Sequence, residues 1–285
     1  MKQYHDVLTE ILDTGTWQKN RTNVESLMIP GAMMKFDMQK GFPAITTKKL
    51  HYQGVIGEMI GFLRGYTHAD EFAKLGCNWW YKDANENTQW KASPYRTSPG
   101  DLGRIYGAQW RRWATTRGFI DQVDMALNTI RRDPTNRRII ISGWRPDEFQ
   151  MMALPPCHVL YQFIVNVERN ELNLCMYQRS CDMFLGVPMN IFGSALLLHL
   201  FAKATGLTPR HFTHFLADAH IYRNHIEQVG IQLGREALPL PTLVLHGMDH
   251  FANVNADGLA KIEPQQIELV NYQHHAAIKG EMVTG

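Results

Sequence analysis

The sequence predicts one α+β domain in which a β-sheet packs against helices. Its 285 residues fit one large domain, and no internal repeat or low-complexity linker divides them. Hydrophobic residues make up 45% and charged residues 20%, which is typical of a globular protein with a sizeable core. Segments with helical and strand periods follow one another without the regular alternation of a parallel α/β fold.

Each helix is predicted from apolar residues at i, i+3 and i+4 and from the residue that ends it. The predicted helices cover residues 4–12, 55–64, 120–130, 191–205 and 219–233. Glycines end three of them, and a proline ends the helix at 120–130: Gly15, Gly65, Gly206 and Pro134.

Strands are predicted where β-branched or alternating apolar residues lie between turn signals. They cover residues 138–141, 158–167, 171–177 and 242–245, and a short apolar run at 27–29 is closed by Pro30-Gly31. Residues 81–100 are polar, with Asn, Ser, Pro and Gly throughout, and are predicted to form a surface loop insert within the domain 1–285.

Charge and targeting signals narrow the class of protein. Lys and Arg number 29 against 27 Asp and Glu, a balance that excludes a general nucleic-acid or membrane binder. The N-terminus lacks the apolar stretch of a secretory signal, and no run of about 18 apolar residues predicts a membrane span. We therefore expect a cytoplasmic protein with no membrane partner and no obligatory nucleic acid.

Cysteine and histidine spacings predict no metal site. The four cysteines form no CxxC pair, which argues against a zinc knuckle or a redox dithiol. Five histidines show no metal-ligand spacing and are interpreted as surface or incidental residues: His211, His214, His225, His274 and His275.

Cys157 is the first candidate for chemistry. It follows two prolines in Leu154-Pro155-Pro156-Cys157-His158, at the entrance to a predicted strand. Antiparallel pairing with the next strand would bring Arg179 near the thiol, and positive charge lowers a thiol pKa. The alternative is a buried small hydrophobe, which is how we interpret Cys175 and Cys181.

Two further groups could bind a ligand. Arg21, the pair Arg137-Arg138, and Arg179 with Ser180 have the guanidinium and hydroxyl groups that suit a phosphate monoester, although single arginines also occur as surface charges. The segment 218–222 places a histidine and a tyrosine two residues apart near a predicted helix start. There they would face a small ligand or serve as satisfied core polar groups.

These motifs, in this order, make the chain resemble the thymidylate synthases over nearly its whole length. The segments that carry the resemblance are 21–22, 41–48, Glu58, Trp80, 101–107, 137–138, 154–158, 177–182, 186–191, 218–222 and 278–279. The resemblance implies a single-domain fold with a mixed sheet and a homodimer formed through that sheet, so that each active site is shared between subunits.

The resemblance also implies how dUMP is bound and attacked. Cys157 would be the thiolate that adds to C6 of the pyrimidine, and Asn190 would read N3 and O4, a pattern that favours uracil over cytosine. The residues that would bind the phosphate are Arg21, Arg179 and Ser180, with Arg137 and Arg138 from the other subunit. The residues that would bind the sugar 3′-hydroxyl are His220 and Tyr222.

The implied co-substrate is 5,10-methylenetetrahydrofolate, and no metal is implied. Glu58 would move protons to and from O4 with His158 nearby, and Tyr106 would position the water that removes the C5 proton. Asp182 would bind the pterin, and Lys48 would meet the glutamate tail. The residues implied to contact the folate are Lys48, Trp80, Leu154, Asp182, Leu185, Gly186 and Met189.

Departures from the family pattern bear on the reaction product. The tail, residues 278–285, is longer and more polar at its end than is usual in the family, where an apolar C-terminal residue helps to close the site over the folate. Looser closure would admit water to the methylene intermediate and give 5-hydroxymethyl-dUMP and tetrahydrofolate.

We therefore interpret the chain first as a dUMP hydroxymethylase, similar to enzymes with which some bacteriophages make modified DNA precursors. The alternative is a thymidylate synthase that gives dTMP and dihydrofolate, with the departures due to drift; retained Trp80 favours it. A non-catalytic nucleotide- or RNA-binding paralogue is a third interpretation, against which intact Cys157, Glu58, Asn190 and Arg179 argue.

Overall fold

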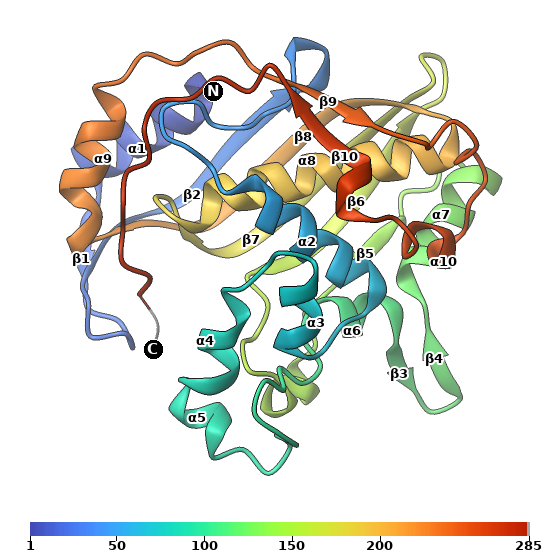
Figure 1. Ribbon diagram of the computed structural model, residues 1–285, viewed down its shortest axis with the longest axis horizontal. Helices are drawn as coiled ribbons and strands as arrows, with labels where there is room; N and C mark the ends of the chain where they lie inside the picture. The colour runs from blue at the N-terminus through green and yellow to red at the C-terminus, as the bar shows by residue number, and fades with distance from the viewer. Residues whose placement is uncertain (284–285) are drawn as a thin grey trace.

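A mixed sheet of six strands forms the centre of the fold (Figure 1). A computed structural model describes residues 1–283 of the chain. The strand order is β1-β2-β8-β7-β6-β5, and only β7 and β8 run parallel to each other. The strands are β1 Thr16–Gln18, β2 Ser26–Asp37, β5 Ile140–Ser142, β6 His158–Asn166, β7 Glu171–Asp182 and β8 Thr208–Tyr222. The prediction of an α+β fold with a mixed sheet is confirmed.

One helix, α8 (Gly186–Thr205), connects the two parallel strands, because parallel neighbours need a crossover connection. It packs against β7, β8 and α2 (Tyr52–Arg64), and most of its side chains are buried. By length and composition α8 would pass for a membrane span, but 78% of its apolar window is buried inside the fold. It is therefore the core helix that covers the inner face of the sheet.

The outer face of the sheet carries large apolar side chains that are exposed. Met33 on β2 pairs with Phe215 on β8, which pairs in turn with Tyr177 on β7. Directly paired residues point to the same face of a sheet, and these three are 59%, 39% and 42% exposed. An apolar row across three strands is unusual for a surface facing water.

Shorter elements surround the sheet and α2. The helices are α1 Lys2–Thr14, α3 Ala69–Lys74, α4 Trp80–Asn85, α5 Thr88–Lys91, α6 Gly107–Arg111, α7 Gln122–Arg132, α9 Ile226–Leu233 and α10 Ala256–Leu259. Two small antiparallel sheets lie apart from the main one: the hairpin of β3 Trp113–Thr115 with β4 Gly118–Ile120, and the pair of β9 Thr242–Leu245 with β10 Ile267–Val270. The predicted helix ends at Gly65 and Gly206 are confirmed, because both glycines adopt the left-handed conformation.

Two sequence predictions are wrong where pairing outweighs local signals. The predicted helix at 219–233 begins only at Ile226, because residues 219–222 complete β8 between β2 and β7. The apolar run at 27–29 belongs to a strand that continues through Pro30. Because β1 pairs only with residues 26–28 of β2, the edge of β2 beside Pro30 has no neighbouring strand on that side. Proline has no N–H group, and at this free edge no hydrogen bond between strands is lost.

The segment 81–100 differs from the predicted surface loop. It begins within α4 and contains α5, and many of its residues are exposed. Two hydrogen bonds attach this segment to the rest of the fold. The Trp90 indole is buried and donates a hydrogen bond to the Asp101 carbonyl at 2.6 Å. Asn87 donates to the Ala153 carbonyl at 2.9 Å. The segment therefore packs against Asp101 and Ala153.

Candidate active site

Cys157 lies directly before β6, opposite the end of β7. His158 pairs with Gln178, and the Arg179 N–H donates to the Cys157 carbonyl at 3.0 Å. The guanidinium of Arg179 turns back onto the prolines, donating from Nε to the Pro156 carbonyl at 2.9 Å and from Nη2 to the Pro155 carbonyl at 2.8 Å. The predicted antiparallel pairing that brings Arg179 to the thiol is confirmed.

Two opposing effects act on the pKa of the Cys157 thiol. Arg179 lowers this pKa, as predicted, but burial raises it by more, so that the net pKa lies above the ordinary value. Arg179 therefore offsets part of the cost that burial imposes on the thiolate.

Tyr106 orients the backbone of Cys157. Its hydroxyl oxygen accepts a hydrogen bond from the Cys157 N–H at 2.8 Å. Its own backbone has φ +23°, a conformation that a residue with a side chain rarely adopts. The ring stacks on Phe62 with centroids 4.7 Å apart and meets the His158 ring edge-on at 5.4 Å. Aromatic packing thus holds Tyr106 in this strained position.

Glu58 is a buried carboxyl group close to neutrality in its pKa. It lies on α2, where the Trp79 indole donates to Oε1 at 2.7 Å. Burial raises the pKa of Glu58 to about 7, with the Trp79 hydrogen bond opposing the shift, so both protonation states are accessible near neutral pH. Sequence reasoning singled out Trp80, which is buried against Phe62 and Tyr106, and missed Trp79.

Three buried histidines are parts of the core. His158 bonds Tyr161 through Nδ1 at 3.0 Å, and burial lowers its pKa to about 4. His214 and His225 are fully buried. Their interpretation as surface or incidental residues is wrong, because β8 turns His214 toward α8 and the C-terminal tail covers His225.

The ends of β7 and β8 bring the other predicted nucleotide-binding residues together. The parallel register sets Asp182 beside His220 and Ser180 beside Asp218. His220 contacts the Asp218 carboxylate at 2.8 Å, and its ring meets that of Tyr222 edge-on at 5.0 Å. Burial raises the pKa of Tyr222 to about 12, so its hydroxyl keeps its proton. These residues lie on a strand and not at the predicted helix start.

Asn190 projects from the first turns of α8, and Gln178 donates a hydrogen bond to its Oδ1 at 2.9 Å. Asp182 accepts hydrogen bonds from the Phe184 and Leu185 N–H groups at 3.0 and 3.2 Å, which shapes the turn into α8. Leu185, Gly186 and Met189 follow and are partly buried. Gln178 is a further residue that sequence reasoning missed.

Lys48 differs most from its expected role. Its ammonium group is buried, donates to the Phe184 carbonyl and lies 3.5 Å from the centre of the Phe184 ring. Burial lowers the pKa of Lys48 to about 7. The structure therefore turns this lysine inward and does not present it as an exposed cation for a carboxylate tail.

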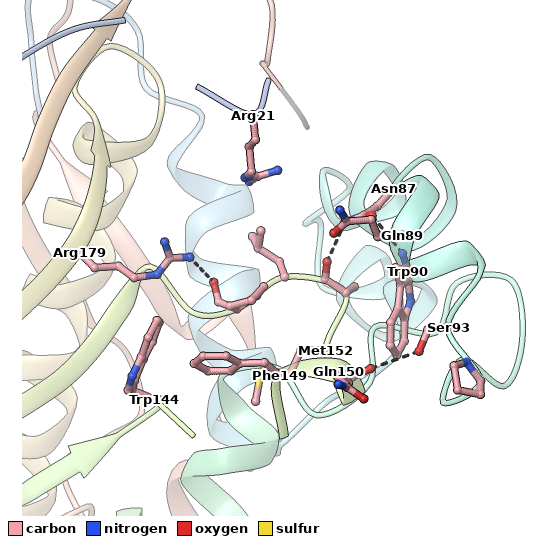
Figure 2. Close-up of a pocket in the computed structure, with 14 residues that line it drawn as sticks. Arg21, Asn87, Gln89, Trp90, Ser93, Trp144, Phe149, Gln150, Met152 and Arg179 are labelled. Carbon is pink, nitrogen blue, oxygen red and sulfur yellow. Dashed lines mark hydrogen bonds between the residues drawn. The ribbon is translucent and has the colours of Figure 1, made fainter. Parts of the chain in front are cut away.

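A cavity of about 630 Å³ adjoins Arg179 (Figure 2). The guanidinium groups of Arg21 and Arg179 face it, Trp144 and Phe149 line its apolar side, and Leu154 is also part of its wall. Arg137 and Arg138 are exposed and do not line it. In residues 1–283 no three His, Cys, Asp or Glu side chains gather as metal ligands would. The cavity therefore combines two cations with aromatic surface.

Comparisons with known proteins show the family of the chain. The sequence model of the family described as thymidylate synthase matches residues 2–284. The chain is 45% identical to the thymidylate synthase of Pseudomonas putida and 43% identical to that of Bordetella parapertussis, over 99% of each chain. It is 38% identical to the thymidylate synthase of Malacoplasma penetrans, again over 99% of both.

Three observations lead to the same assignment. Strand pairing holds a cysteine beside an anchored arginine, a buried carboxyl group has a pKa near 7, and one family matches nearly the whole length of the chain. The chain belongs to the thymidylate synthase family.

Proposed function

We propose that the protein is a thymidylate synthase, which converts dUMP and 5,10-methylenetetrahydrofolate into dTMP and dihydrofolate. The observation that carries the proposal is the backbone pairing of Cys157 with Arg179, which brings a thiol and an anchored guanidinium close together. Relatives at 38–45% identity, all named thymidylate synthase, support it.

Cys157 starts the reaction by adding to C6 of the uracil ring, which makes C5 a carbon nucleophile. Asn190 binds N3–H and O4 of the base, while His220 and Tyr222 bind the sugar. Glu58, with a pKa of about 7, gives a proton to O4 as charge develops there and later removes it. Tyr106 holds the Cys157 backbone and a water near C5.

The position of the tail favours a methyl product over a hydroxymethyl product. Gly280 packs so closely on Phe184 that a Cβ atom would lie 2.6 Å from the ring. His225 contacts the Glu281 carbonyl at 2.9 Å, and Lys82 on α4 donates to the Met282 carbonyl at 3.0 Å. The tail thus runs from α9 toward α4 (Figure 1).

A tail held at both sides excludes water from the intermediate, so that hydride transfer from the folate completes the methyl group. The sequence-based preference for a hydroxymethylase of the bacteriophage type depended on a loosely closing tail, and nothing in the comparisons supports it. The last two residues of that tail, Thr284 and Gly285, lie outside the described residues.

The product of the reaction tests this proposal. The purified protein is incubated with dUMP and 5,10-methylenetetrahydrofolate, the nucleotide is analysed by mass spectrometry and dihydrofolate is followed by absorbance. We expect a nucleotide with added methyl mass and one dihydrofolate for each dTMP. A hydroxymethyl nucleotide without dihydrofolate would overturn the proposal in favour of the hydroxymethylase.

We further propose that the enzyme is a homodimer formed through the outer face of the sheet. The exposed row of Met33, Phe215 and Tyr177 gives this face an apolar surface that a second copy would cover. Arg137 and Arg138 precede β5 at the edge of the same sheet and are exposed. From there they would reach the phosphate bound by the partner subunit.

A further inference from the structure

We propose that His214 is a positioning residue that determines which base the site accepts, acting through Gln178 on Asn190. The inference rests on the proposed function, in which Asn190 binds the pyrimidine. His214 does not contact the nucleotide in this arrangement. It sets the orientation of the amide that does.

A chain of short hydrogen bonds joins the three side chains. His214 Nε2 lies 2.8 Å from Gln178 Oε1, and Gln178 Nε2 lies 2.9 Å from Asn190 Oδ1. The histidine is fully buried and Gln178 is 2% exposed, whereas Asn190 is partly accessible. This series of hydrogen bonds therefore runs from the core to the edge of the site, across β8, β7 and α8.

The Ser180 carbonyl gives this chain one direction. Gln178 Nε2 also lies 2.9 Å from that carbonyl oxygen, which can only accept a hydrogen bond. The amide nitrogen of Gln178 must therefore face Ser180 and Asn190, and its oxygen must face His214. A flipped Gln178 amide would set two oxygen atoms against each other.

It follows that His214 carries its proton on Nε2. The ring is neutral near pH 7, because burial lowers its pKa to about 3, and a neutral imidazole has one N–H group. The other nitrogen, Nδ1, is buried without a hydrogen-bond partner in the described part of the chain. Placing the proton there would leave a buried N–H unpaired and would also remove the donor that Gln178 needs.

The consequence for the base lies in the Asn190 amide. Because Gln178 donates to Asn190 Oδ1, the oxygen is fixed as the acceptor and the NH₂ group as the donor. Uracil offers N3–H and the O4 acceptor, which match this orientation. Cytosine offers an N3 acceptor and an N4 donor, which oppose it. Without the His214 donor, the Gln178 amide oxygen is left unpaired and only the Ser180 carbonyl still favours this orientation of Gln178, so discrimination between the bases falls.

The test compares kcat/KM for dUMP and for dCMP in His214→Phe and His214→Gln. We expect His214→Phe to lower the ratio of kcat/KM for dUMP to kcat/KM for dCMP by about 10- to 100-fold, because the buried amide oxygen of Gln178 is then left unpaired. We expect His214→Gln to keep most of the preference, because its amide N–H donates to Gln178 Oε1. His199→Phe is the matched control, since His199 is another histidine with a pKa lowered by burial, and its Nε2 has no hydrogen-bond partner among residues 1–283.

Two results would overturn the inference. One is an unchanged ratio of kcat/KM values in a folded His214→Phe variant, and the other is an equal loss for both nucleotides, which would mean a purely structural role. The tautomer of His214 in the wild-type protein, measured by ¹⁵N NMR, tests the inference even if His214→Phe fails to fold. The Nε2–H form is expected, and the Nδ1–H form would contradict it.

The proposed function fails separately, if the wild-type protein converts neither nucleotide. In that case the relative binding affinities for dUMP and dCMP in the same variants, measured by calorimetry, replace the kinetic ratio. A preference for dUMP that His214→Phe narrows still supports the inference, and a preference that it leaves unchanged overturns it.

Discussion

The two sides of the proposed active site, one for the nucleotide and one for the folate, are built in different ways. On the nucleotide side, Cys157, Arg179 and His220 owe their positions to backbone pairing among β6, β7 and β8. On the folate side, α4 and the C-terminal tail are joined by single contacts such as that of Lys82 with Met282. Shared sheet hydrogen bonds resist displacement, whereas single exposed contacts open easily.

Rigidity is needed where bonds form. In the proposed reaction, bond formation at C6 requires the thiol and the phosphate-binding cation to be held to within a fraction of an ångström, which a sheet can do. Admission of the folate and exclusion of water require a part that opens and closes. Substitutions on the rigid side should therefore have larger effects than substitutions on the mobile side.

Replacing the nucleophile breaks the rigid side most completely. Cys157→Ser should lower turnover by about 10³-fold or more, because a serine hydroxyl has no thiolate reactivity at neutral pH. The covalent ternary complex with 5-fluoro-dUMP and the folate, detected by mass spectrometry, should be absent. Cys175→Ser, on the partly exposed thiol of β7, is the control and should form it. An intact adduct in Cys157→Ser would refute the assignment.

Glu58→Gln should lower kcat by about 10²–10⁴-fold and flatten its pH dependence near 7, because general acid–base catalysis is lost. The raised pKa also predicts a change in stability. Glu58 stabilises the fold fully below pH 4.5, its ordinary pKa, and this contribution is lost as pH rises to about 7.

Between those pH values the unfolding free energy of the wild type should fall by roughly 3 kcal/mol relative to Glu58→Gln. Denaturant titrations at pH 5 and pH 8 measure this difference. Equal pH dependence in the two proteins would mean that Glu58 titrates normally.

The dimer proposal extends the rigid side to a second copy. Phe215→Glu places a charge in the exposed apolar row and should give monomers in analytical ultracentrifugation. Affinity for dUMP should then fall at least about tenfold, since charge-assisted bonds from Arg137 and Arg138 are lost. Phe119→Glu, on the exposed hairpin strand β4, is the matched control and should remain dimeric. A verified monomer with full dUMP affinity would exclude the shared site.

The smallest effect is expected on the folate side. Lys82→Ala removes one hydrogen bond to the tail and should raise the fraction of hydroxymethyl product only a few-fold, while dUMP binding stays unchanged. Lys91→Ala, an exposed lysine on the neighbouring α5, serves as control. The nucleotide products of both variants are compared by mass spectrometry. A loss of dUMP affinity in Lys82→Ala would mean that the two sides are coupled.

Local sequence signals predicted the parts of the fold whose shape depends on nearby residues. Gly65 and Gly206 end their helices because a left-handed residue is needed there. The prolines before Cys157 and the alternating strand after it predicted the approach of Arg179. Residues 219–222 were assigned wrongly, because their conformation comes from pairing with β2 and β7, which lie far away in the sequence.

The family, and the proposed nucleophile with its neighbouring cation, follow from residue types in a fixed order along the chain, so the amino-acid sequence is enough to recognise them. The ionisation of the site follows from three-dimensional packing. Burial raises the pKa values of Cys157 and Glu58 and lowers those of Lys48 and His214. Desolvation depends on which distant segments cover a group, and no local pattern records that.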